Sequence, residues 1–169
     1  MAAKGSIMPI MVQMREKPLT QRGRDVPCIR QVSVFVENRV GVLAGLMGIF
    51  DNTGVKTLAL TVVQGFDCAI VRFVFDDTDR AIQTLRHHDY HFSICELVAV
   101  EIGSDAPGDG LARISKALLG AEIDIHYVYA LLTTARRAPA VVIHVDNPVL
   151  AGTVLVESRF TLLDENDLR

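Results

Sequence analysis

Hydrophobic residues along this chain recur either at every second position, as in a strand, or every three to four positions, as on one face of a helix. The first change from one spacing to the other separates a predicted strand from a predicted helix. In residues 31–36 valines alternate with other side chains, which predicts a strand. The four apolar residues that come next are spaced as one face of a helix: Leu43, Leu46, Met47 and Phe50. The sequence Asn-Thr-Gly at 52–54 then predicts the end of that helix.

The residues that follow complete one structural unit. Residues 55–63 alternate and are rich in β-branched side chains, and a turn at 64–67 leads into the apolar run 68–75, so a hairpin is predicted. Aspartates within 76–79 are good N-caps for a second helix, and 91–102 is predicted to be a long closing strand. The predicted order is therefore strand, helix, strand, strand, helix, strand.

The same pattern occurs a second time at matching positions. Leu43 matches Leu111 at an offset of 68 (111 minus 43), and this offset holds from the helix into the following strand. Past the second hairpin, at 135–139, the offset becomes 70, so that Asp76 matches Asp146. Two consecutive copies of a βαββαβ unit are therefore predicted.

A βαββαβ unit makes a four-stranded antiparallel sheet with both helices on one face, so the predicted fold class is α+β with two tandem ferredoxin-like units. We expect the first unit at 30–103 and the second at 104–169, with a last strand at 160–163. Edge-to-edge pairing of the two sheets would bring both strand-to-helix corners toward the shared interface. Residues 1–29 predict an extended or partly disordered arm or, alternatively, an edge strand at 10–14.

Composition narrows the class of protein. Half of the residues are hydrophobic and the formal net charge is −3, which gives no long-range attraction for phosphate backbones, so no nucleic-acid partner is expected. Three cysteines fit neither a disulfide framework nor zinc-ligand spacing, which favours a reduced, cytoplasmic location: Cys28, Cys68 and Cys95. No run approaches the ~20 apolar residues of a membrane-spanning helix, and the apolar run at 7–14 lacks a signal-peptide cleavage site, so no membrane association is expected.

Neither a metal site nor a catalytic set of residues is predicted. His87 and His88 are adjacent and face different directions, so together with His91 they are interpreted as solvated histidines rather than metal ligands. No nucleophile and base occur at a recognisable spacing, and no phosphate loop or cofactor signature is present, so neither enzymatic activity nor a cofactor is expected. RNA-recognition domains and metal chaperones share the βαββαβ order, but their aromatic and CxxC patterns are missing.

The corner at 38–43 is the strongest candidate for a binding site. A polar turn that leads into a helix exposes main-chain N–H donors in the positive field of the helix dipole, which suits an anion. Gly41 has no Cβ that would keep a ligand away from the main chain. The other interpretation of this stretch is an ordinary turn whose donors are bonded to water.

With this repeat and its two corners, the chain resembles tandem ACT-domain proteins that bind amino acids. The corner pattern of that family is Asp or Asn, Arg, Pro, Gly, any residue, Leu. The first corner matches it except that valine replaces proline: Asn38, Arg39, Val40, Gly41, Val42 and Leu43. The second corner lacks the arginine and contains one extra residue, and its corresponding positions are Asp105, Pro107, Gly108, Gly110 and Leu111. The resemblance covers about residues 30–163.

The resemblance implies a non-catalytic protein of allosteric regulation that binds a free amino acid at the interface between ACT units. The carboxylate of that amino acid would bind the main-chain amides of 41–43, and the side chain of Asn38 or Asp105 would hold its polar groups. One corner or both would bind a ligand. Asp67 would pair with an ammonium group or be a plain turn residue, and Tyr129 would cover a ligand side chain or pack in the core.

A related alternative is a regulatory subunit that acts mainly by contact with an amino-acid biosynthetic enzyme, similar to the small subunit of acetolactate synthase. Exposed sheet edges in both units predict a homodimer. The expected partners are therefore a free amino acid, a second copy of the chain, and an enzyme of amino-acid metabolism.

Overall fold

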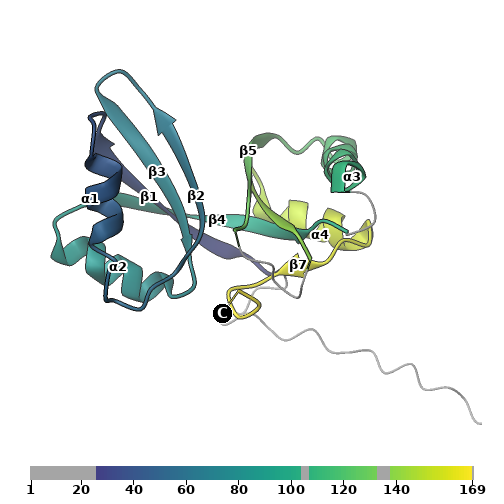
Figure 1. Cartoon of the computed structure of the whole chain (residues 1–169). Helices are drawn as coiled ribbons and strands as arrows, with labels where there is room; N and C mark the ends of the chain where they lie inside the picture. The colour runs from purple at the N-terminus through teal and green to yellow at the C-terminus, as the bar shows by residue number, and fades with distance from the viewer. Residues whose placement is uncertain (1–25, 104–106, 133–137, 169) are drawn as a thin grey trace, which may run out of the picture.

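The computed structural model describes residues 26–103, 107–132 and 138–168 (Figure 1). The first six elements are β1 (Ile29–Glu37), α1 (Val42–Gly48), β2 (Thr57–Gln64), β3 (Cys68–Phe75), α2 (Thr78–His87) and β4 (His91–Glu101). They are followed by α3 (Pro107–Gly120), β5 (Ile125–Ala130), β6 (Ala140–Val145), α4 (Pro148–Glu157) and β7 (Leu162–Leu163). This order confirms the predicted α+β fold of two ferredoxin-like units. The edge strand predicted at 10–14 lies outside the described residues.

The long strand β4 takes part in both units. Its residues 91–97 pair antiparallel with β1, beginning with His91 opposite Phe35. Its last residues, 98–101, pair with β6, and β7 pairs with the same part of β4. The strand order is β2-β3-β1-β4-β6-β5, with β7 beside β4. The second unit therefore obtains its first strand from β4, and the two sheets are joined through one continuous strand.

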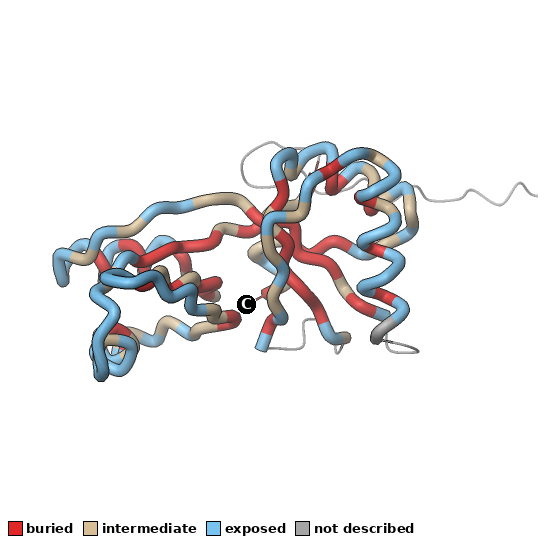
Figure 2. Tube along the Cα trace, turned by 90° about the horizontal axis from the view of Figure 1, so that it is seen from above, coloured by how far each residue is buried: buried red, intermediate tan, exposed pale blue. Residues whose placement is uncertain are grey.

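The helices cover the outer faces of the two sheets, and the helix-free faces meet between them. Helices α1 and α2 lie on the first sheet, and α3 and α4 lie on the second, at the other side of the molecule (Figure 1). Buried residues follow the strands through the centre of the molecule (Figure 2). The apolar core between the sheets consists of Ile29, Leu58, Ala59, Val74, Leu97, Ala99, Leu131, Ala140, Val142, Leu163 and Leu168.

The second helix of each unit begins and ends in the same way. The Asp77 carboxylate accepts from the N–H of Arg80 at the start of α2, as predicted, and the Asn147 side chain accepts from that of Leu150 at the start of α4. After each helix comes a residue with positive φ, 56° at Asp89 and 66° at Arg159. The N–H of the next residue then bonds back to a carbonyl in the helix, from Tyr90 to Leu85 (3.0 Å) and from Phe160 to Leu155 (2.9 Å). The duplication is thus present in the backbone at the predicted offset of 70.

Candidate ligand-binding site

The first corner makes a tight left-handed turn between β1 and α1. Gly41 has φ 89°, a conformation that costs little only for glycine, and its carbonyl accepts the first helical hydrogen bond from the N–H of Gly45 (3.0 Å). No side chain caps this helix start. A Cβ built at Gly41 would meet no atom within 4 Å. Glycine is therefore required here by the backbone angle, and the space beside it is open.

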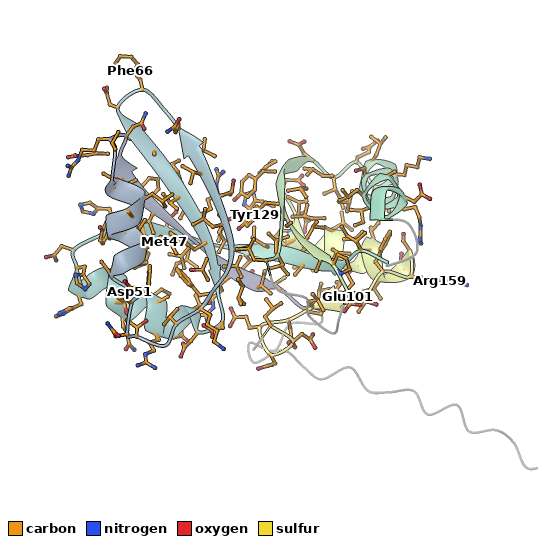
Figure 3. The ribbon with its side chains drawn as sticks, viewed as in Figure 1. Met47, Asp51, Phe66, Glu101, Tyr129 and Arg159 are labelled. Atoms are coloured by element: carbon orange, nitrogen blue, oxygen red, sulfur yellow. The ribbon has the colours of Figure 1, made fainter. Side chains whose placement is uncertain are left out.

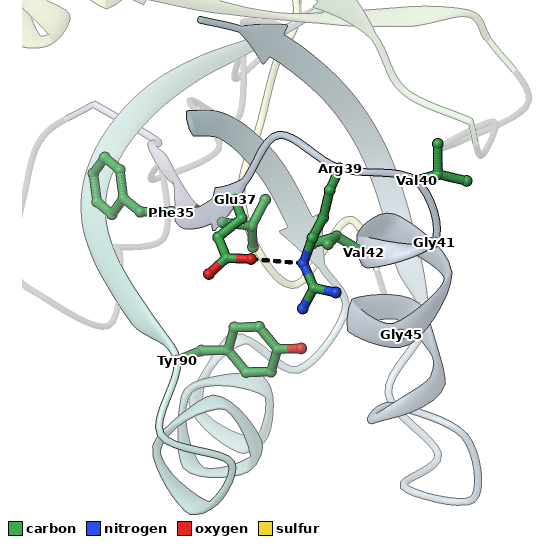
Figure 4. Close-up of a pocket in the computed structure, with 9 residues that line it drawn as sticks. Phe35, Glu37, Arg39, Val40, Gly41, Val42, Gly45 and Tyr90 are labelled. Carbon is green, nitrogen blue, oxygen red and sulfur yellow. Dashed lines mark hydrogen bonds and ion pairs between the residues drawn. The ribbon is translucent and has the colours of Figure 1, made fainter. Parts of the chain in front are cut away.

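A cavity of about 380 Å³ lies against this corner (Figure 4). Its lining consists of Phe35, Val36, Glu37, Arg39, Val40, Gly41, Val42, Gly45 and Tyr90. Nε of Arg39 lies 2.6 Å from Oε2 of Glu37, and both side chains are mostly exposed. Because water screens such a pair, it contributes little to stability, and each partner can exchange for a ligand group. The cavity thus offers one positive and one negative group beside an aromatic ring.

The predicted residues Asn38 and Asp67 hold the corner rather than line the cavity. The main-chain N–H of Asn38 donates to the carbonyl of Asp67 (3.2 Å). Nδ2 of Asn38 donates to the carbonyl of Gly65 (3.0 Å), and Oδ1 accepts from Nε2 of Gln64 (3.3 Å). The Asn38 side chain therefore ties the corner to the β2–β3 turn. Leu43 lies on α1, is partly exposed, and does not line the cavity.

The second unit has a cavity of about 340 Å³ at the equivalent place. Its lining consists of Glu101, Gly103, Asp109, Gly110, Arg113, Ala138, Arg159, Phe160 and Thr161. In both units the cavity lies between the end of the first strand, the start of the first helix and the residue after the second helix. Tyr90 in the first cavity and Phe160 in the second are related by the offset of 70 (160 minus 90). The two units therefore have cavities at equivalent positions of the repeat.

The residues predicted for the second corner differ in whether they line the second cavity. Gly110 lines the second cavity, and a Cβ there would collide with the side chain of Ile102, so glycine permits the close approach of α3 to this residue just after β4. Pro107 and Gly108 are the first residues of α3, and Leu111 follows on it without lining the cavity. Asp105 lies outside the described residues.

The two corners do not approach each other within one chain, so the expectation that both face a shared interface is wrong. The first corner follows β1 at the end where Phe35 pairs with His91, the first residue of β4. The second cavity contains Glu101, the last residue of β4. Eleven residues of strand place these ends about 33 Å apart. The physical reason is that the units share one strand instead of pairing edge to edge.

Tyr129 belongs to the core between the units and lines neither cavity. Its hydroxyl donates to Oε1 of Gln31 over 2.8 Å, and its ring stacks on that of Tyr127 at 6.3 Å. Burial raises the pKa of Tyr129, so the hydroxyl remains a donor at neutral pH. Of the two roles considered for this residue, the structure places it in the packing role (Figure 3).

Several lining residues were not predicted from the sequence. Glu37 and Tyr90 in the first cavity, and Glu101, Arg159 and Phe160 in the second, come from strand ends and from turns after the second helices. The offset of 70, applied beyond Asp146, would have matched Tyr90 with Phe160, the positions that follow the second helix of each unit. The offset of 70 would not have paired Glu37 with Glu101, because the number of residues between each glutamate and the helix that follows it differs in the two units.

Histidines gather at one further cavity, of about 470 Å³, between β4, β5 and β6. Nδ1 of His126 lies 2.9 Å from Nδ1 of His144. The described residues contain no group of three or more His, Cys, Asp or Glu side chains that could hold a metal ion, and this includes the neighbourhood of His87, His88 and His91. Among the helices in the described ranges, none is both long and apolar enough to cross a membrane.

Known proteins with similar folds are consistent with this architecture. The crystal structure of a protein from Bacteroides thetaiotaomicron has 26% identity and a TM-score of 0.75, over 85% of this chain and 96% of that one. Regulatory subunits of aspartate kinase from Thermus thermophilus and Thermus flavus have TM-scores of 0.54 and 0.52, both at 14% identity and over 79% of this chain, and the match covers 93% and 91% of theirs. At this identity they show similarity of fold.

Among curated proteins, none matches the chain. The model of one family, described as an ACT domain pair, matches residues 27–169. This match covers both units that the structure describes, including the shared strand β4. The chain therefore belongs to the ACT domain pair family.

Proposed function

We propose that this protein is a non-catalytic regulator that binds a free amino acid in the first cavity. The observation that supports this most is the Arg39–Glu37 pair at the corner that matches the family pattern. An amino acid carries a carboxylate that can replace Glu37 on Arg39, and an ammonium group that can replace Arg39 on Glu37. The two charges of the pair thus match the two charges of the ligand.

The rest of the cavity suits the same ligand. Gly41 leaves open space beside the main chain, so that the carboxylate can also approach backbone N–H groups at the start of α1. The rings of Phe35 and Tyr90 provide apolar surface for the ligand side chain. A cavity of about 380 Å³ falls in the range of small-molecule sites.

The lining favours binding over catalysis. Its ionisable side chains are Glu37, Arg39 and Tyr90, and this set contains no nucleophile activated by a neighbouring base. We therefore infer that the protein turns over neither acyl phosphates, phosphoesters nor amino acids. A saturable turnover that disappears in Arg39→Ala would overturn this inference.

A second copy of the chain is the proposed neighbour at the first corner. The two corners of one chain lie at opposite ends of β4, so the second corner does not cover the first cavity of its own chain, and the corner of a second copy can do so. Val40 is fully exposed beside the cavity and would be buried by such a neighbour. Cys68 and Cys95 are not in disulfide bonds, which fits a cytoplasmic location.

Contact with an enzyme of amino-acid metabolism is the second candidate function. Phe66 at the tip of the β2–β3 turn is 97% exposed, and this turn is hydrogen-bonded to the corner through Asn38 (Figure 3). An exposed aromatic side chain on a turn that contacts the ligand site could report ligand binding to a protein partner. The fold similarity to regulatory subunits of aspartate kinase agrees with this class of partner.

Calorimetry tests the main proposal. Each of the twenty common amino acids is titrated into the wild-type protein, and we expect at least one to bind. Arg39→Gln should weaken that binding at least about tenfold, because a charge-assisted bond to the carboxylate is lost. A protein that binds none of them would favour the second candidate, which a pull-down with and without amino acids then examines, using Phe66→Ser as the variant that should lose its partner.

A further inference from the structure

The N-terminal end of the described chain packs into the second unit beside α4. Val26 is 7% exposed and belongs to the apolar core of that unit, together with Ala151 and Leu155. A Cβ built at Gly152 would collide with the side chain of Val26, so this glycine leaves a notch on α4 that the valine fills. At the offset of 70 the first unit has Ile82 in this place, buried in the core of its own unit. The second unit therefore uses a residue from before the repeat to complete the packing of its helix.

The exposed face of α4 next to this notch is apolar. Val149 and Val156 flank Gly152 on the helix surface, three residues before it and four after it. Val149 is 50% exposed and Leu150 is 43% exposed. Among the ten residues of α4, Glu157 is the one that is charged. Because a helix on a protein surface usually has charged and polar residues on its outer face, an apolar outer face indicates that something covers it.

The equivalent helix of the first unit has a charged outer face. At the offset of 70, Asp79 and Arg80 on α2 occupy the positions of Val149 and Leu150 on α4. Both of these charged residues are exposed. The two helices occupy the same place in their units, so the fold itself does not require apolar residues there. The apolar outer face is therefore specific to the unit in which Val26 lies.

The segment that precedes Val26 in the same chain has the composition to cover this face. Residues 7–14, which lie outside the described residues, are apolar except for Gln13 and include three methionines. Methionine side chains are flexible and adapt to irregular apolar surfaces. Twelve residues separate position 14 from position 26 (26 minus 14), which allows a span of up to about 40 Å, whereas α4 is about 15 Å long. The apolar run can therefore reach every part of the helix.

Charge favours the same placement. Residues 1–25 contain five basic and two acidic residues, which leaves 12 basic and 18 acidic residues of the chain's 17 and 20 in the part from 26 onward. The N-terminal segment and the rest of the chain thus have net charges of opposite sign, which attract each other. The exposed Glu157 at the end of α4 adds negative charge beside the apolar face.

We propose that residues 7–14 bind to the exposed apolar face of α4 in the same chain, with Val26 as the fixed point. This inference does not depend on the proposed function, because no residue of α4 lines the first or the second cavity. A short linker gives a tethered segment an effective concentration on the order of millimolar, which favours the chain's own segment over that of a second copy. The family match begins at residue 27, so this segment lies outside the ACT domain pair.

Methionine methyl signals in nuclear magnetic resonance test this contact in the full chain. In a protein with isotope-labelled methionine methyl groups, Met8, Met11 and Met14 report on the segment, and Met47 on α1 reports on the first unit. We expect at least one of the three segment signals to differ from that of free methionine. In Val149→Asp the segment signals should move to the position of free methionine, because a carboxylate then faces the apolar run and the bound fraction falls at least about tenfold. The Met47 signal should stay in place.

Three further variants make the test specific. Leu119→Asp is the matched control, because Leu119 is 75% exposed on α3 of the same unit, and this variant should leave all methionine signals unchanged. Ile10→Asp changes the segment instead of the helix and so leaves the packing of the second unit intact. It should release the methionines in the same way and shift the amide signals of Val149 and Thr153. Ile10→Val keeps an apolar side chain and should behave as the wild type does.

Three results would overturn the inference. The first is a wild-type protein whose segment methionines have the signals of free methionine. The second is a set of displaced signals that neither Val149→Asp nor Ile10→Asp changes. The third is a displacement that grows with protein concentration, because it would place the segment on α4 of a second copy. None of these results bears on amino-acid binding in the first cavity, so failure of this inference is distinguishable from failure of the proposed function.

Discussion

The hydroxyl of Tyr129 donates to Oε1 of Gln31 over 2.8 Å and so joins the second unit to the first. Gln31 is fully buried, and its Nε2 also donates to the hydroxyl of Tyr127 (2.9 Å) and to Oγ of Ser33 (3.0 Å). All polar groups of the Gln31 amide are thus bonded in the core between the sheets. A buried polar network of this kind favours one arrangement over its alternatives, so it fixes how the two units sit on the shared strand.

Gln31→Leu should reduce the free energy of unfolding by about 2–3 kcal/mol. The substitution removes the acceptor of the part-buried Tyr129 hydroxyl and one partner of the Tyr127 hydroxyl, and each group left unsatisfied costs roughly 1–3 kcal/mol. Urea denaturation followed by circular dichroism measures the loss. Tyr129→Phe, which removes one bond, should cost less. An unchanged denaturation midpoint in Gln31→Leu would show that the network adds nothing to stability.

Gly41→Val should abolish or strongly weaken binding at the first cavity while the protein still folds. The left-handed φ of 89° is strained for a β-branched residue, at a cost on the order of 1–3 kcal/mol, so the corner must rearrange. Calorimetry with the bound amino acid measures the loss. Gly45→Ala is the matched control, because Gly45 lines the same cavity on α1 and its added Cβ meets no atom within 4 Å. Unchanged affinity in a folded Gly41→Val protein would remove the corner from the site.

Local sequence patterns predicted most of the secondary structure, because the spacing of hydrophobic residues changes sharply between the strand segments and the helix segments. The apolar run after the turn was expected at 68–75, and β3 has those bounds. The sharing of β4 was not predicted. Residues 97–100 are a continuous apolar run that is buried on both faces, and such a run gives no sign of where one sheet ends and the next begins.

The candidate site was only partly predictable for a related reason. Arg39 and Gly41 stand in one short motif, so sequence alone found them. Glu37, Tyr90 and Glu101 reach the cavities from other elements, and only the sheet pairing and the turns after α2 and α4 bring them there. The expected meeting of the two corners failed because the pattern shows which strands exist and not which edges pair.

The histidine pair should make stability depend on pH. Burial, and then the charges of His126 and Arg72, lower the pKa of His144 below its usual 6.5. The unfolded chain therefore binds this proton more readily than the folded protein does, and the stabilisation is present above about pH 6.5 and is lost as pH falls through the lowered pKa. Urea denaturation at pH 7.5 and 5 should show a smaller loss for His144→Gln than for the wild type.

At least one free amino acid should raise the melting temperature by about 5–10 °C, whereas its decarboxylated amine should have little or no effect. A ligand that binds only the folded protein at 100 times its Kd stabilises it by about 2.7 kcal/mol. For a chain of 169 residues each kcal/mol corresponds to roughly 2–4 °C. The amine is the decisive control, because we propose that Arg39 in the first cavity binds the carboxylate.

The same melts distinguish a sensor of amino acids from a subunit that acts by protein contact. If the shift for the active amino acid disappears in Arg39→Gln, the first cavity carries the effect. An amine that stabilises as well as its amino acid would mean that Arg39 does not recognise a carboxylate. The contact through Phe66 would then be the better account of how this protein regulates its partner.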